Sequence, residues 1–496
     1  MVFSSPEFLF LFLPVTLAGW MLLGRLGPDW AKWWLLAASL TYYGWGNPFF
    51  LPVLLGSLLF NFAAAAALAR ARARKRLLLV LSVAANLALL GGFKYRDFFA
   101  GLANTLFGAD LPLLHMALPL GISFFSFIQI AHLVDVSCGA KPAGSLREYG
   151  LFVAFFPQLL AGPIVLGREM FPQHADLAAG RLNWNNVCVG VFVFTVGLSK
   201  KVVLADPLGQ WVAAGFDLAP TLSLLEAWAC ALAYSLQIYF DFSGYSDMAV
   251  GVALLFNIRL PANFNSPYKS ADISEFWRRW HITLGRWLRE YLYIPLGGSR
   301  AGLWRTLCNL AVVLFLAGLW HGAGMGFVIW GLLHGAALIV YRIWREFGRP
   351  LPRLVGQALT FLFVVWAWVP FRAASLDDTL KIWRGMFLGG ASGIQASPLL
   401  SVAMSYLRRV CELLLERIAG LTAPANVEAL PFLVLGLGIV FLLPNSMQYI
   451  GFVDRDGVCP LPRLRLSHAL GLGLALAACL MCMLASSGSE FIYFKF

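Results

Sequence analysis

Histidine is the residue in this sequence best suited to acid–base chemistry, and two of the seven histidines lie deep in stretches without formal charge. His321 is part of Gly318-Leu-Trp-His-Gly322, and His334 is part of Leu332-Leu-His-Gly335. An ionisable residue in an apolar segment is costly, so each is a candidate for function. A neutral imidazole there could accept a proton from an alcohol near pH 7, as a general base does. The competing interpretation is a histidine that only hydrogen-bonds a neighbouring helix.

The spacing of these two histidines indicates different roles. They are thirteen residues apart, which on one unbroken helix places them about 140° from each other. They would reach the same atom only if the glycines at 322, 324 and 326 break the helix and rotate one half. Glycines beside His321 also let the backbone bend and let a substrate approach closely. His321 is therefore the stronger candidate, and a structural role is favoured for His334.

Two carboxylates lie near or within another apolar stretch, Tyr239-Phe-Asp-Phe-Ser-Gly-Tyr-Ser-Asp247. Their separation corresponds to a net turn of about 240° on a helix, so Asp241 and Asp247 do not share a face. The plainer interpretation is that each pairs with an arginine or caps a helix break at Gly244. The functional alternative is that they shape a substrate cavity.

The charged segment between residues 257 and 305 cannot span a membrane and predicts an amphipathic helix instead. Asp272-Ile-Ser-Glu275 resembles a capping box at its start. At about 100° per residue, one face collects Trp277, Trp280, His281, Leu284, Trp287, Leu288 and Tyr291, and the other collects Arg278, Arg279, Arg286, Arg289 and Glu290. We expect this helix, residues 275–291, to lie near the membrane surface or to roof a cavity, with His281 facing protein or lipid.

Several common catalytic patterns are absent from the sequence. It has no Gly-x-Ser-x-Gly nucleophile elbow, no Walker loop or dinucleotide-binding glycine motif, and no His, Asp and Glu spacing typical of a metal site. The eight cysteines form no Cys-x-x-Cys pair, so neither a disulfide framework nor a zinc site is expected. We therefore expect no metal and no bound cofactor.

The elements that position these residues are expected to be membrane-spanning helices. Hydrophobic residues make up 60% of the 496 residues and charged residues only 12%, against about 25% charged in soluble domains. Since a span needs about 20 apolar residues, uncharged stretches predict about eleven to thirteen spans. The fourteen candidates, not all of which are expected to span, are residues 8–23, 33–69 (two spans), 77–93, 111–134, 149–167, 182–199, 224–256, 306–341 (two spans), 354–371, 386–407, 429–447 and 466–487.

Two of these stretches leave alternatives open. Residues 33–46 are short enough to be re-entrant, and 385–430 could form a span, a re-entrant hairpin or a surface helix. No long linker divides the chain, so a single membrane domain, residues 1–496, is expected. The result is an all-α, polytopic integral membrane protein.

Basic residues predict the orientation of the chain in the bilayer. The densest cluster is Arg70, Arg72, Arg74, Lys75 and Arg76, which should be cytoplasmic because short cytoplasmic loops are rich in Lys and Arg. Three spans precede the cluster, so the N-terminus is expected outside. The net charge of +12 is explained by these loops and by lipid headgroups, and no nucleic-acid partner is expected.

Four long strings resemble the membrane-bound O-acyltransferase family, most closely its bacterial polysaccharide branch. They are Met1-Val-Phe-Ser-Ser-Pro-Glu-Phe-Leu-Phe-Leu-Phe-Leu-Pro14; Tyr239-Phe-Asp-Phe-Ser-Gly-Tyr-Ser-Asp-Met-Ala249; Asn263-Phe-Asn-Ser-Pro-Tyr268 with Phe276-Trp-Arg-Arg-Trp-His-Ile-Thr-Leu284 and Trp287-Leu-Arg-Glu-Tyr-Leu-Tyr-Ile294; and Gly318-Leu-Trp-His-Gly322 with Trp330-Gly-Leu-Leu-His-Gly335. The resemblance covers most of the chain and extends to Phe491-Ile-Tyr-Phe-Lys-Phe496. It is weakest at 385–430.

The resemblance implies a fold and roles for particular residues. The family fold is a ring of tilted helices with re-entrant or interfacial helices around a central funnel, where a thinned core brings donor and acceptor together. The family's near-universal histidine falls on His321 as general base. The second catalytic position falls on His281, which would orient the donor or stabilise the developing oxyanion. The candidate substrate-binding residues are Asp241, Trp277, Arg286, Trp320 and His334.

The function implied by the resemblance is O-acetylation of an exopolysaccharide such as alginate. Acetyl-CoA or another cytosolic thioester would supply the acetyl group across the bacterial inner membrane to a periplasmic acetyltransferase partner. Within the family, a D-alanyl transferase of teichoic acids, fed by a carrier protein, is the alternative. From other classes, a transporter of acyl or glycan precursors predicts movement without covalent chemistry, and a scaffold of a secretion complex predicts that His321→Ala is harmless. Neither the polysaccharide, an acyl-histidine intermediate nor the oligomeric state follows from the sequence.

Overall fold

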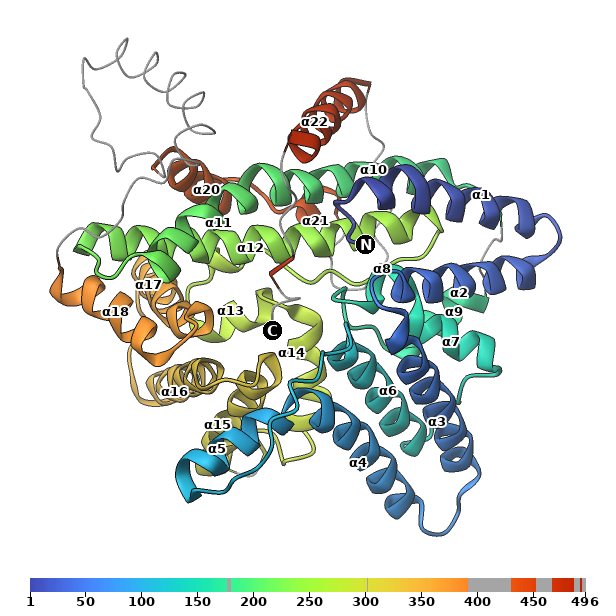
Figure 1. Ribbon diagram of the computed structural model, residues 1–496, viewed down its shortest axis with the longest axis horizontal. Coiled ribbons are helices and arrows are strands. Elements are labelled where there is room, and N and C mark those ends of the chain that lie inside the picture. Colours follow the sequence, from blue (N-terminus) through green and yellow to red (C-terminus); the bar gives the residue numbers. More distant parts are fainter. Residues whose placement is uncertain (176–179, 301, 391–429, 452–465, 486–490, 493–496) are drawn as a thin grey trace.

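The computed structural model describes residues 1–175, 180–300, 302–390, 430–451, 466–485 and 491–492 (Figure 1). Within these ranges the chain forms helices joined by loops and contains no β-strand. The predicted all-α class is therefore confirmed. The prediction that residues 1–496 form one domain is not tested, and most of the uncertain stretch 385–430 lies outside the described residues.

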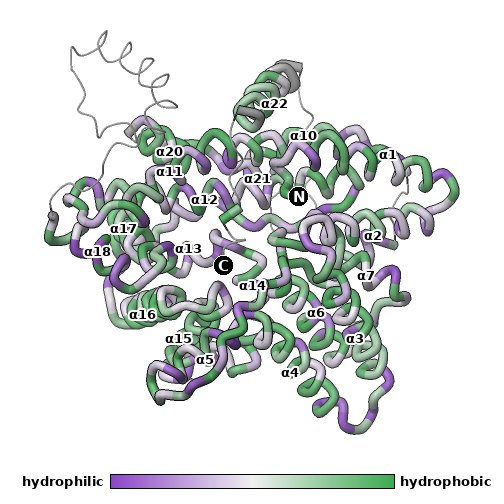
Figure 2. The backbone as a smooth tube through the Cα atoms, in the orientation of Figure 1, coloured by the Kyte–Doolittle hydropathy of each residue, from purple (hydrophilic) through white to green (hydrophobic). Residues whose placement is uncertain are grey.

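The N-terminal helices form hairpins at one side of the molecule (Figure 1). Their bounds are η1 (Phe8–Phe12), α1 (Leu13–Gly24), α2 (Pro28–Gly44), η2 (Pro48–Phe50), α3 (Leu51–Arg70), α4 (Lys75–Lys94) and α5 (Arg96–Phe107). Figure 2 shows the helices α3 and α4 as mainly hydrophobic and their connection as hydrophilic. Inside this hairpin Asn61 and Asn86 exchange hydrogen bonds of 3.0 and 2.7 Å. Such polar pairs hold helices together where lipid offers no partner.

The middle of the chain contains both spans and short buried helices. Its helices are α6 (Ile122–Ser137), α7 (Leu146–Ala154), α8 (Phe156–Leu159), α9 (Gly167–Ala175), α10 (Trp184–Ser199), η3 (Lys200–Ala205), α11 (Asp206–Ala213), η4 (Ala214–Leu218) and α12 (Leu224–Leu255). The candidate spans 182–199 and 224–256 correspond to α10 and α12. Two other candidates were placed wrongly, because α6 begins only at Ile122 and 149–167 is not one helix.

The stretch 149–167 is apolar because it is buried in protein. Phe155 has an extended conformation that ends α7, and Pro157 stands in the first turn of the short α8, where proline loses no helical hydrogen bond. Gly162 and Pro163 follow in a loop. Every residue from Tyr149 to Leu166 is buried. A short buried segment cannot be told from part of a span by composition alone.

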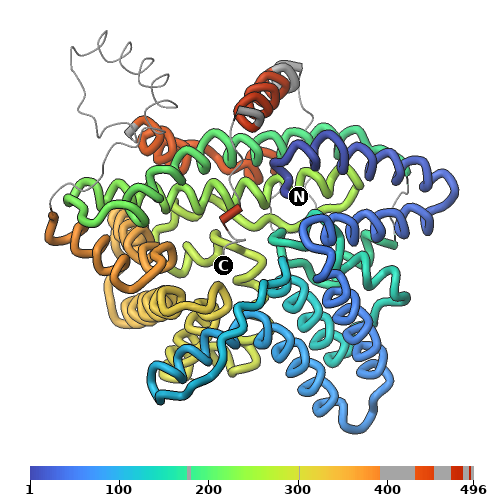
Figure 3. Tube along the Cα trace, in the orientation of Figure 1, coloured from blue at the N-terminus to red at the C-terminus, as the bar shows by residue number. Residues whose placement is uncertain are grey.

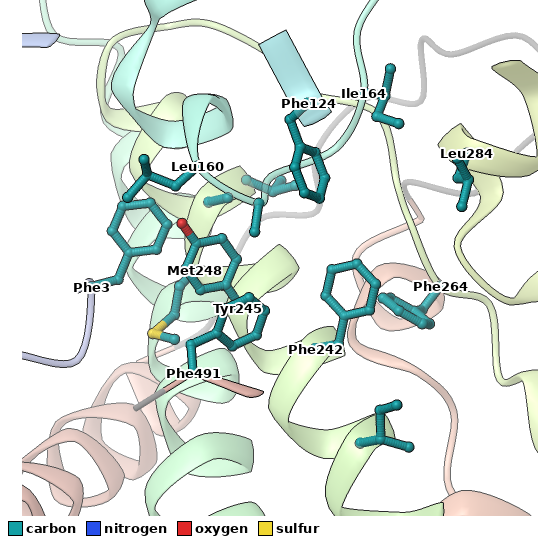
Figure 4. Packing of buried hydrophobic residues seen from close by; sticks show 14 of the residues in the cluster. Phe3, Phe124, Leu160, Ile164, Phe242, Tyr245, Met248, Phe264, Leu284 and Phe491 are labelled. Atoms are coloured by element: carbon teal, nitrogen blue, oxygen red, sulfur yellow. The ribbon is translucent and has the colours of Figure 1, made fainter. Parts of the chain in front are cut away.

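Helix α12 is the central element of the structure (Figure 1). Ser223 and Glu226 form a capping box at its start, which satisfies two otherwise free N–H groups. It packs backbone to backbone on α10, since a Cβ at Gly197 would lie 2.5 Å from the Gly244 oxygen. Small residues permit this close crossing within a membrane. Segments from near both ends of the sequence also meet at α12 (Figure 3), where Tyr245 stacks on Phe3 at 4.8 Å and on Phe491 at 4.3 Å (Figure 4).

The C-terminal half supplies the remaining helices. They are η5 (Pro267–Lys269), α13 (Ile273–Arg279), α14 (Ile282–Leu288), η6 (Arg289–Tyr293), α15 (Leu303–His321), α16 (Met325–Phe347), α17 (Arg353–Arg372), α18 (Leu376–Leu388), α20 (Leu430–Leu442), α21 (Ser446–Tyr449) and α22 (Leu466–Ala485). The expected division of 306–341 into two helices is present, with the break between His321 and Met325.

The single amphipathic helix predicted at 275–291 is wrong. Trp280 is extended and His281 is left-handed, with φ 44°, so the segment forms the two short helices α13 and α14. The capping box is also only half formed: Asp272 accepts the N–H of Glu275, but the Glu275 carboxylate accepts from Ala271. A neighbouring loop explains the break, because its backbone takes up the groups that a helix would use. The Asn265 N–H donates to the Arg279 carbonyl, and the Ile282 N–H donates to the Asn263 carbonyl.

Length and composition identify the chain as a multi-pass membrane protein. Six described helical stretches are long and apolar enough to cross a bilayer, and four shorter apolar helices of 10–17 residues accompany them. The six are Pro48–Arg70, Lys75–Lys94, Trp184–Leu218, Leu303–His321, Met325–Phe347 and Arg353–Arg372. The count of eleven to thirteen spans stays a prediction.

Candidate active site

His321 is the last residue of α15, at the turn of a tightly packed helical hairpin. Helices α15 and α16 touch backbone to backbone: a Cβ at Gly318 would lie 2.4 Å from the Phe327 oxygen, and one at Gly331 would lie 2.5 Å from the Leu314 oxygen. Gly322 is fully extended, so the chain leaves the helix directly after His321. The glycines therefore break the helix as the sequence analysis required for the two histidines to approach each other.

The rings of His321 and His334 both contact the ring of Trp330. The centroid of Trp330 is 5.0 Å from that of His321 and 4.9 Å from that of His334. His321 is 5% exposed and also packs edge-on against Phe371 at 5.1 Å. The break in the helix thus places the two histidines in one aromatic cluster, which an unbroken helix would not.

His334 lies deeper than His321, in a box of aromatic rings. Trp277 packs edge-on against it at 5.2 Å, and Phe363 does so at 5.3 Å. Among the described residues, neither ring nitrogen of His334 has a hydrogen-bond partner. The described residues therefore do not show His334 as a histidine that only hydrogen-bonds a neighbouring helix. Contact of His334 and Trp277 with substrate stays a prediction.

His281 occupies the junction between α13 and α14 and is 1% exposed. The expectation that it faces protein is confirmed. Its φ of 44° places a non-glycine residue in the left-handed region, a conformation that surrounding contacts must hold and that clusters at functional sites. Its ring packs edge-on against Phe242 at 4.8 Å, and Figure 4 shows Phe242 beside Phe264 in this core.

Asn263 determines which nitrogen of His281 carries the proton. His281 Nδ1 lies 3.1 Å from Asn263 Oδ1, and the Thr283 backbone N–H donates to the same Oδ1 at 3.3 Å. An atom that accepts from a backbone N–H is the oxygen of the amide, so Nδ1 of the imidazole must donate to it. Burial lowers the pKa of His281 to about 3, so the ring is neutral near pH 7. In this tautomer Nε2 carries the lone pair and can accept a proton or a hydrogen bond. The catalytic role of His281, in orienting the donor or stabilising the oxyanion, stays a prediction.

Trp320 connects the two histidine sites. Its ring centroid is 4.8 Å from that of His321 and 6.3 Å from that of His281. It stacks on Phe127 at 5.3 Å, and Phe127 in turn stacks on Trp287 at 3.9 Å. Residues from α6, α14 and α15 therefore hold Trp320 between the histidines. Of the candidate substrate-binding residues, Trp320 is the one in contact with both histidines.

A cavity of about 60 Å³ opens beside His321, which is room for a few water-sized groups. It is lined by Lys94, Leu118, Pro119, Leu120, Gly121, Ile122, Ser123, Phe124, Leu160, Trp320 and His321. A hydroxyl or a carbonyl oxygen could therefore reach the imidazole without entering bulk lipid. No group of three or more His, Cys, Asp or Glu side chains that could hold a metal ion occurs in the described part of the chain.

The two buried aspartates of α12 pair with lysines of η3. Asp247 is 2.6 Å from Lys200 Nζ, and Asp241 is 2.7 Å from Lys201 Nζ. Asp241 also accepts the backbone N–H of Ile492 at 2.8 Å, which ties the end of the chain to the core. The sequence analysis considered that each aspartate pairs with an arginine. Each does form an ion pair, but its partner is a lysine. A substrate-binding role for Asp241 stays a prediction.

Arg286 joins α14 to helix α9 and to the loop that precedes α9. Its guanidinium makes a bidentate pair with Glu169 of α9 and donates to the Ile164 carbonyl at 3.1 Å. These contacts fix α14, and with it the neighbouring His281, against α9. No contact of Arg286 with the His321 cavity is described, so its predicted role in substrate binding is untested.

Sequence reasoning missed two residues that hold the histidines. Asn263 appeared only within a string that carried the resemblance, and Lys94 only as the charged end of an uncharged stretch. Lys94 Nζ donates to the carbonyl of Trp320 at 2.6 Å and to that of His321 at 2.9 Å. A lysine at the end of a span is common, so its position in the sequence gave no signal of this contact.

Comparison with known proteins identifies the family of the chain. The family model for MBOAT, the membrane-bound O-acyltransferase family, matches residues 142–375. The peptidoglycan O-acetyltransferase of Helicobacter pylori is 41% identical, over 100% of this chain and 98% of that protein. The probable alginate O-acetylase AlgI of Azotobacter vinelandii is 37% identical over 100% of both chains. The teichoic acid D-alanyltransferase of Bacillus subtilis is 26% identical over 50% of this chain and 64% of its own.

The similarities to the peptidoglycan O-acetyltransferase and the Azotobacter protein extend over the whole chain, beyond the residues that the family model matches. They show that the chain is an O-acyltransferase enzyme. The chain belongs to the membrane-bound O-acyltransferase family and is a multi-pass membrane O-acyltransferase.

Proposed function

We propose that this enzyme O-acetylates a bacterial cell-surface polysaccharide, taking acetyl from a cytosolic thioester such as acetyl-CoA and passing it across the inner membrane. A periplasmic acetyltransferase partner then esterifies the sugar. The observation that carries the proposal is the meeting of His321 and His281 on the ring of Trp320, with a cavity at His321. The relatives named for acetyl transfer match the full chain, whereas the D-alanyltransferase matches half of it.

The geometry supports a general-base mechanism. His321 takes the proton of an acceptor hydroxyl, and the oxygen attacks the carbonyl carbon of the thioester. A C–O bond forms, the C–S bond breaks, and the imidazolium returns the proton to the leaving thiolate. His281, with its lone pair on Nε2, accepts a hydrogen bond from the acceptor hydroxyl or the donor and so orients it. Trp320 keeps the two rings at a fixed spacing.

The choice of polysaccharide depends on the acceptor and its partner. The names of the full-length relatives include both peptidoglycan and alginate. Both glycans present hydroxyl groups outside the inner membrane, so the same acetyl relay serves either. We propose this shared step, delivery of acetyl to the outer side of the membrane, as the activity of the chain itself.

Thioester turnover by purified protein in nanodiscs tests the proposal. With radiolabelled acetyl-CoA, we expect His321→Ala to lose activity by a factor of about 10² or more, as removal of a general base does. The control is His174→Ala, because His174 is also fully buried but lies in α9, outside the cavity lining. It should keep the wild-type rate wherever it keeps the wild-type Tm.

Other outcomes would contradict particular parts of the proposal. Equal rates for wild type and His321→Ala would exclude His321 as the base. Turnover of a D-alanyl carrier protein, with none of acetyl-CoA, would replace the acetyl donor by a charged carrier. Passage of intact labelled thioester into vesicles, without covalent transfer, would favour a transporter.

A further inference from the structure

The last turn of α15 is held by side chains from a distant helix. Lys94 Nζ donates to the carbonyls of Trp320 and His321, at 2.6 and 2.9 Å, and the Tyr95 hydroxyl donates to the Leu319 carbonyl at 2.9 Å. Three consecutive carbonyls that end the helix of His321 are thus satisfied by the neighbouring residues at the end of α4. The lysine and His321 are 227 residues apart in the chain.

These bonds replace the usual ending of a helix. The last four carbonyls of a helix have no partner within it, and a left-handed glycine or a basic residue of the same helix commonly supplies one. Gly322 is extended and provides no such cap. The ammonium of Lys94 supplies both the donors and a positive charge opposite the negative end of the helix dipole. The cap is therefore supplied by another helix of the same chain, α4.

A cap from another helix fixes position as well as satisfying hydrogen bonds. Lys94 and His321 line the same cavity, which is also walled by Gly121 and Phe124. Among the described residues lining it, Lys94 is the one Lys, Arg, Asp or Glu. Its ammonium also lies 5.9 Å from the ring of Trp320. Lys94 is half-buried, and a charge that is partly withdrawn from water in a membrane protein is a candidate for function.

We propose that Lys94 is a positioning residue for acyl transfer: its ammonium holds the end of α15 so that His321 and Trp320 face the cavity in reactive geometry. This inference rests on the proposed function, since it assigns to Lys94 the alignment of the base. A shift of about 1 Å in a reacting group can cost a factor of about 10² in rate. Loss of the cap should therefore reduce kcat more than it weakens binding of the thioester.

The test compares Lys94→Met, Lys94→Arg and wild type in the acetyl-CoA turnover assay. Methionine keeps the apolar length of the side chain and removes the charge and the donors. We expect kcat to fall by a factor of about 10 to 10², with KM for acetyl-CoA within about twofold. Arginine, which keeps the charge and the donors, should recover most of the lost kcat. Rescue by arginine is not expected if the side chain only fills space.

A matched control is available in Lys269. Its ammonium donates at 2.7 Å to the carbonyl of Leu443, just past the end of α20, so it also caps a helix from outside. Lys269→Met should lose this cap and leave kcat unchanged, because α20 carries no residue of the cavity beside His321. Tyr95→Phe removes only the bond to Leu319 and should lower kcat by less than Lys94→Met.

The outcomes separate this inference from the proposed function. No turnover of either acetyl-CoA or a charged carrier protein by wild type, with an acceptor partner supplied, would contradict the proposed function itself. Turnover by wild type with equal kcat in Lys94→Met would overturn the role of Lys94, and so would a loss that Lys94→Arg does not relieve at an unchanged Tm. If Lys94→Met does not fold, Lys94→Gln decides, since glutamine keeps a polar donor and removes the charge, and a wild-type kcat there would show that the ammonium does not position His321.

Discussion

At the scale of single residues, hydrogen bonds from the surrounding loop determine the orientation and the protonated nitrogen of His281. The imidazole of His281 is fixed by Asn263, which accepts from Nδ1 and from the backbone and hydroxyl of Thr283. The Thr283 hydroxyl in turn accepts the N–H of Ile164 at 2.9 Å. This series of hydrogen bonds fixes the orientation of the His281 ring and leaves the lone pair on Nε2. Asn263 is therefore expected to control the protonation of His281.

Asn263→Asp tests this control through the dependence of activity on pH. A carboxylate beside Nδ1 favours imidazolium, so it should raise the pKa of His281 from its lowered value of about 3. Activity needs the lone pair on Nε2, which is present above that pKa and lost as pH falls through it. The acidic limb of kcat/KM should therefore move to higher pH than in wild type. Profiles that superimpose would show that His281 does not act through Nε2.

The two candidate catalytic residues could be predicted from the sequence, but their supports could not. His321 and His281 stand within the long strings that carry the resemblance to the family. Asn263 stands in such a string too, yet its partner is known only once the backbone break at Trp280 and His281 is seen. Lys94 belongs to an ordinary apolar span, and its contact joins segments 227 residues apart. Contacts of that range leave no periodic pattern in one sequence.

At the scale of elements, the hairpin of α15 and α16 depends on close backbone approach. Gly331 faces the Leu314 oxygen, where a Cβ would lie at 2.5 Å, and Gly318 lies directly across from it. The helices thus cross at the glycines, one turn from His321. Widening this crossing would move the base relative to the ring of Trp330.

Gly331→Ala is expected to destabilise the hairpin. Overpacking of a well-packed contact costs about 1–3 kcal/mol, because the backbone oxygen that the new methyl group meets cannot move aside. The measurement is the Tm in detergent together with kcat, and both should fall. The control is Gly56→Ala in α3, where a Cβ meets nothing within 4 Å and where alanine favours the helix by about 0.5–1 kcal/mol. An unchanged Tm for Gly331→Ala would contradict the close crossing.

Prediction of the elements succeeded for long isolated spans and failed for short or interrupted ones. Helices α4, α12, α15, α16 and α17 were all foreseen, because charges or glycines bracket each uncharged run. The segment 275–291 had the periodicity of one helix, but the loop at Asn263 and Asn265 captures the backbone groups at its centre. Tertiary hydrogen bonds there outweigh local pattern. The prediction of a span at residues 149–167 was wrong for a different reason, because this apolar stretch is surrounded by protein and not by lipid.

At the scale of the whole molecule, two helices define a direction through the membrane. Helix α4 starts in the basic cluster Arg70–Arg76 and ends at Lys94, and α15 starts beside Arg300 and Arg305 and ends at His321. Their ends meet through the bonds from Lys94. A helix of 20 residues is about 30 Å long, close to the thickness of the hydrocarbon. The basic N-terminal ends of α4 and α15 should therefore lie on one side of the membrane. Their C-terminal ends, which include Lys94 and His321, should lie toward the other side.

Cysteine labelling can test this direction in a Gram-negative host. With Cys411 and Cys459 and the exposed cysteines Cys138, Cys188, Cys308 and Cys482 replaced by serine, single cysteines are placed at Arg74, Arg300 and Asp110. Asp110 follows α5, which begins directly after Lys94 and Tyr95. The positive-inside rule places Arg74 and Arg300 in the cytoplasm. A membrane-impermeant maleimide should label them only after lysis, and should label Asp110→Cys in intact spheroplasts.

The result bears on how acetyl crosses the membrane. If the basic loops are cytoplasmic, a cytosolic thioester must reach His321 from the side where α15 begins, while the cavity lined by Lys94 and Gly121 lies toward the opposite side. The acyl group would then change sides at His321 itself, because donor and acceptor approach one imidazole from opposite faces. Labelling of Arg74→Cys and Asp110→Cys from the same side would contradict this geometry. His321 would then act on one face of the membrane only, and a separate step would have to carry the acetyl group across.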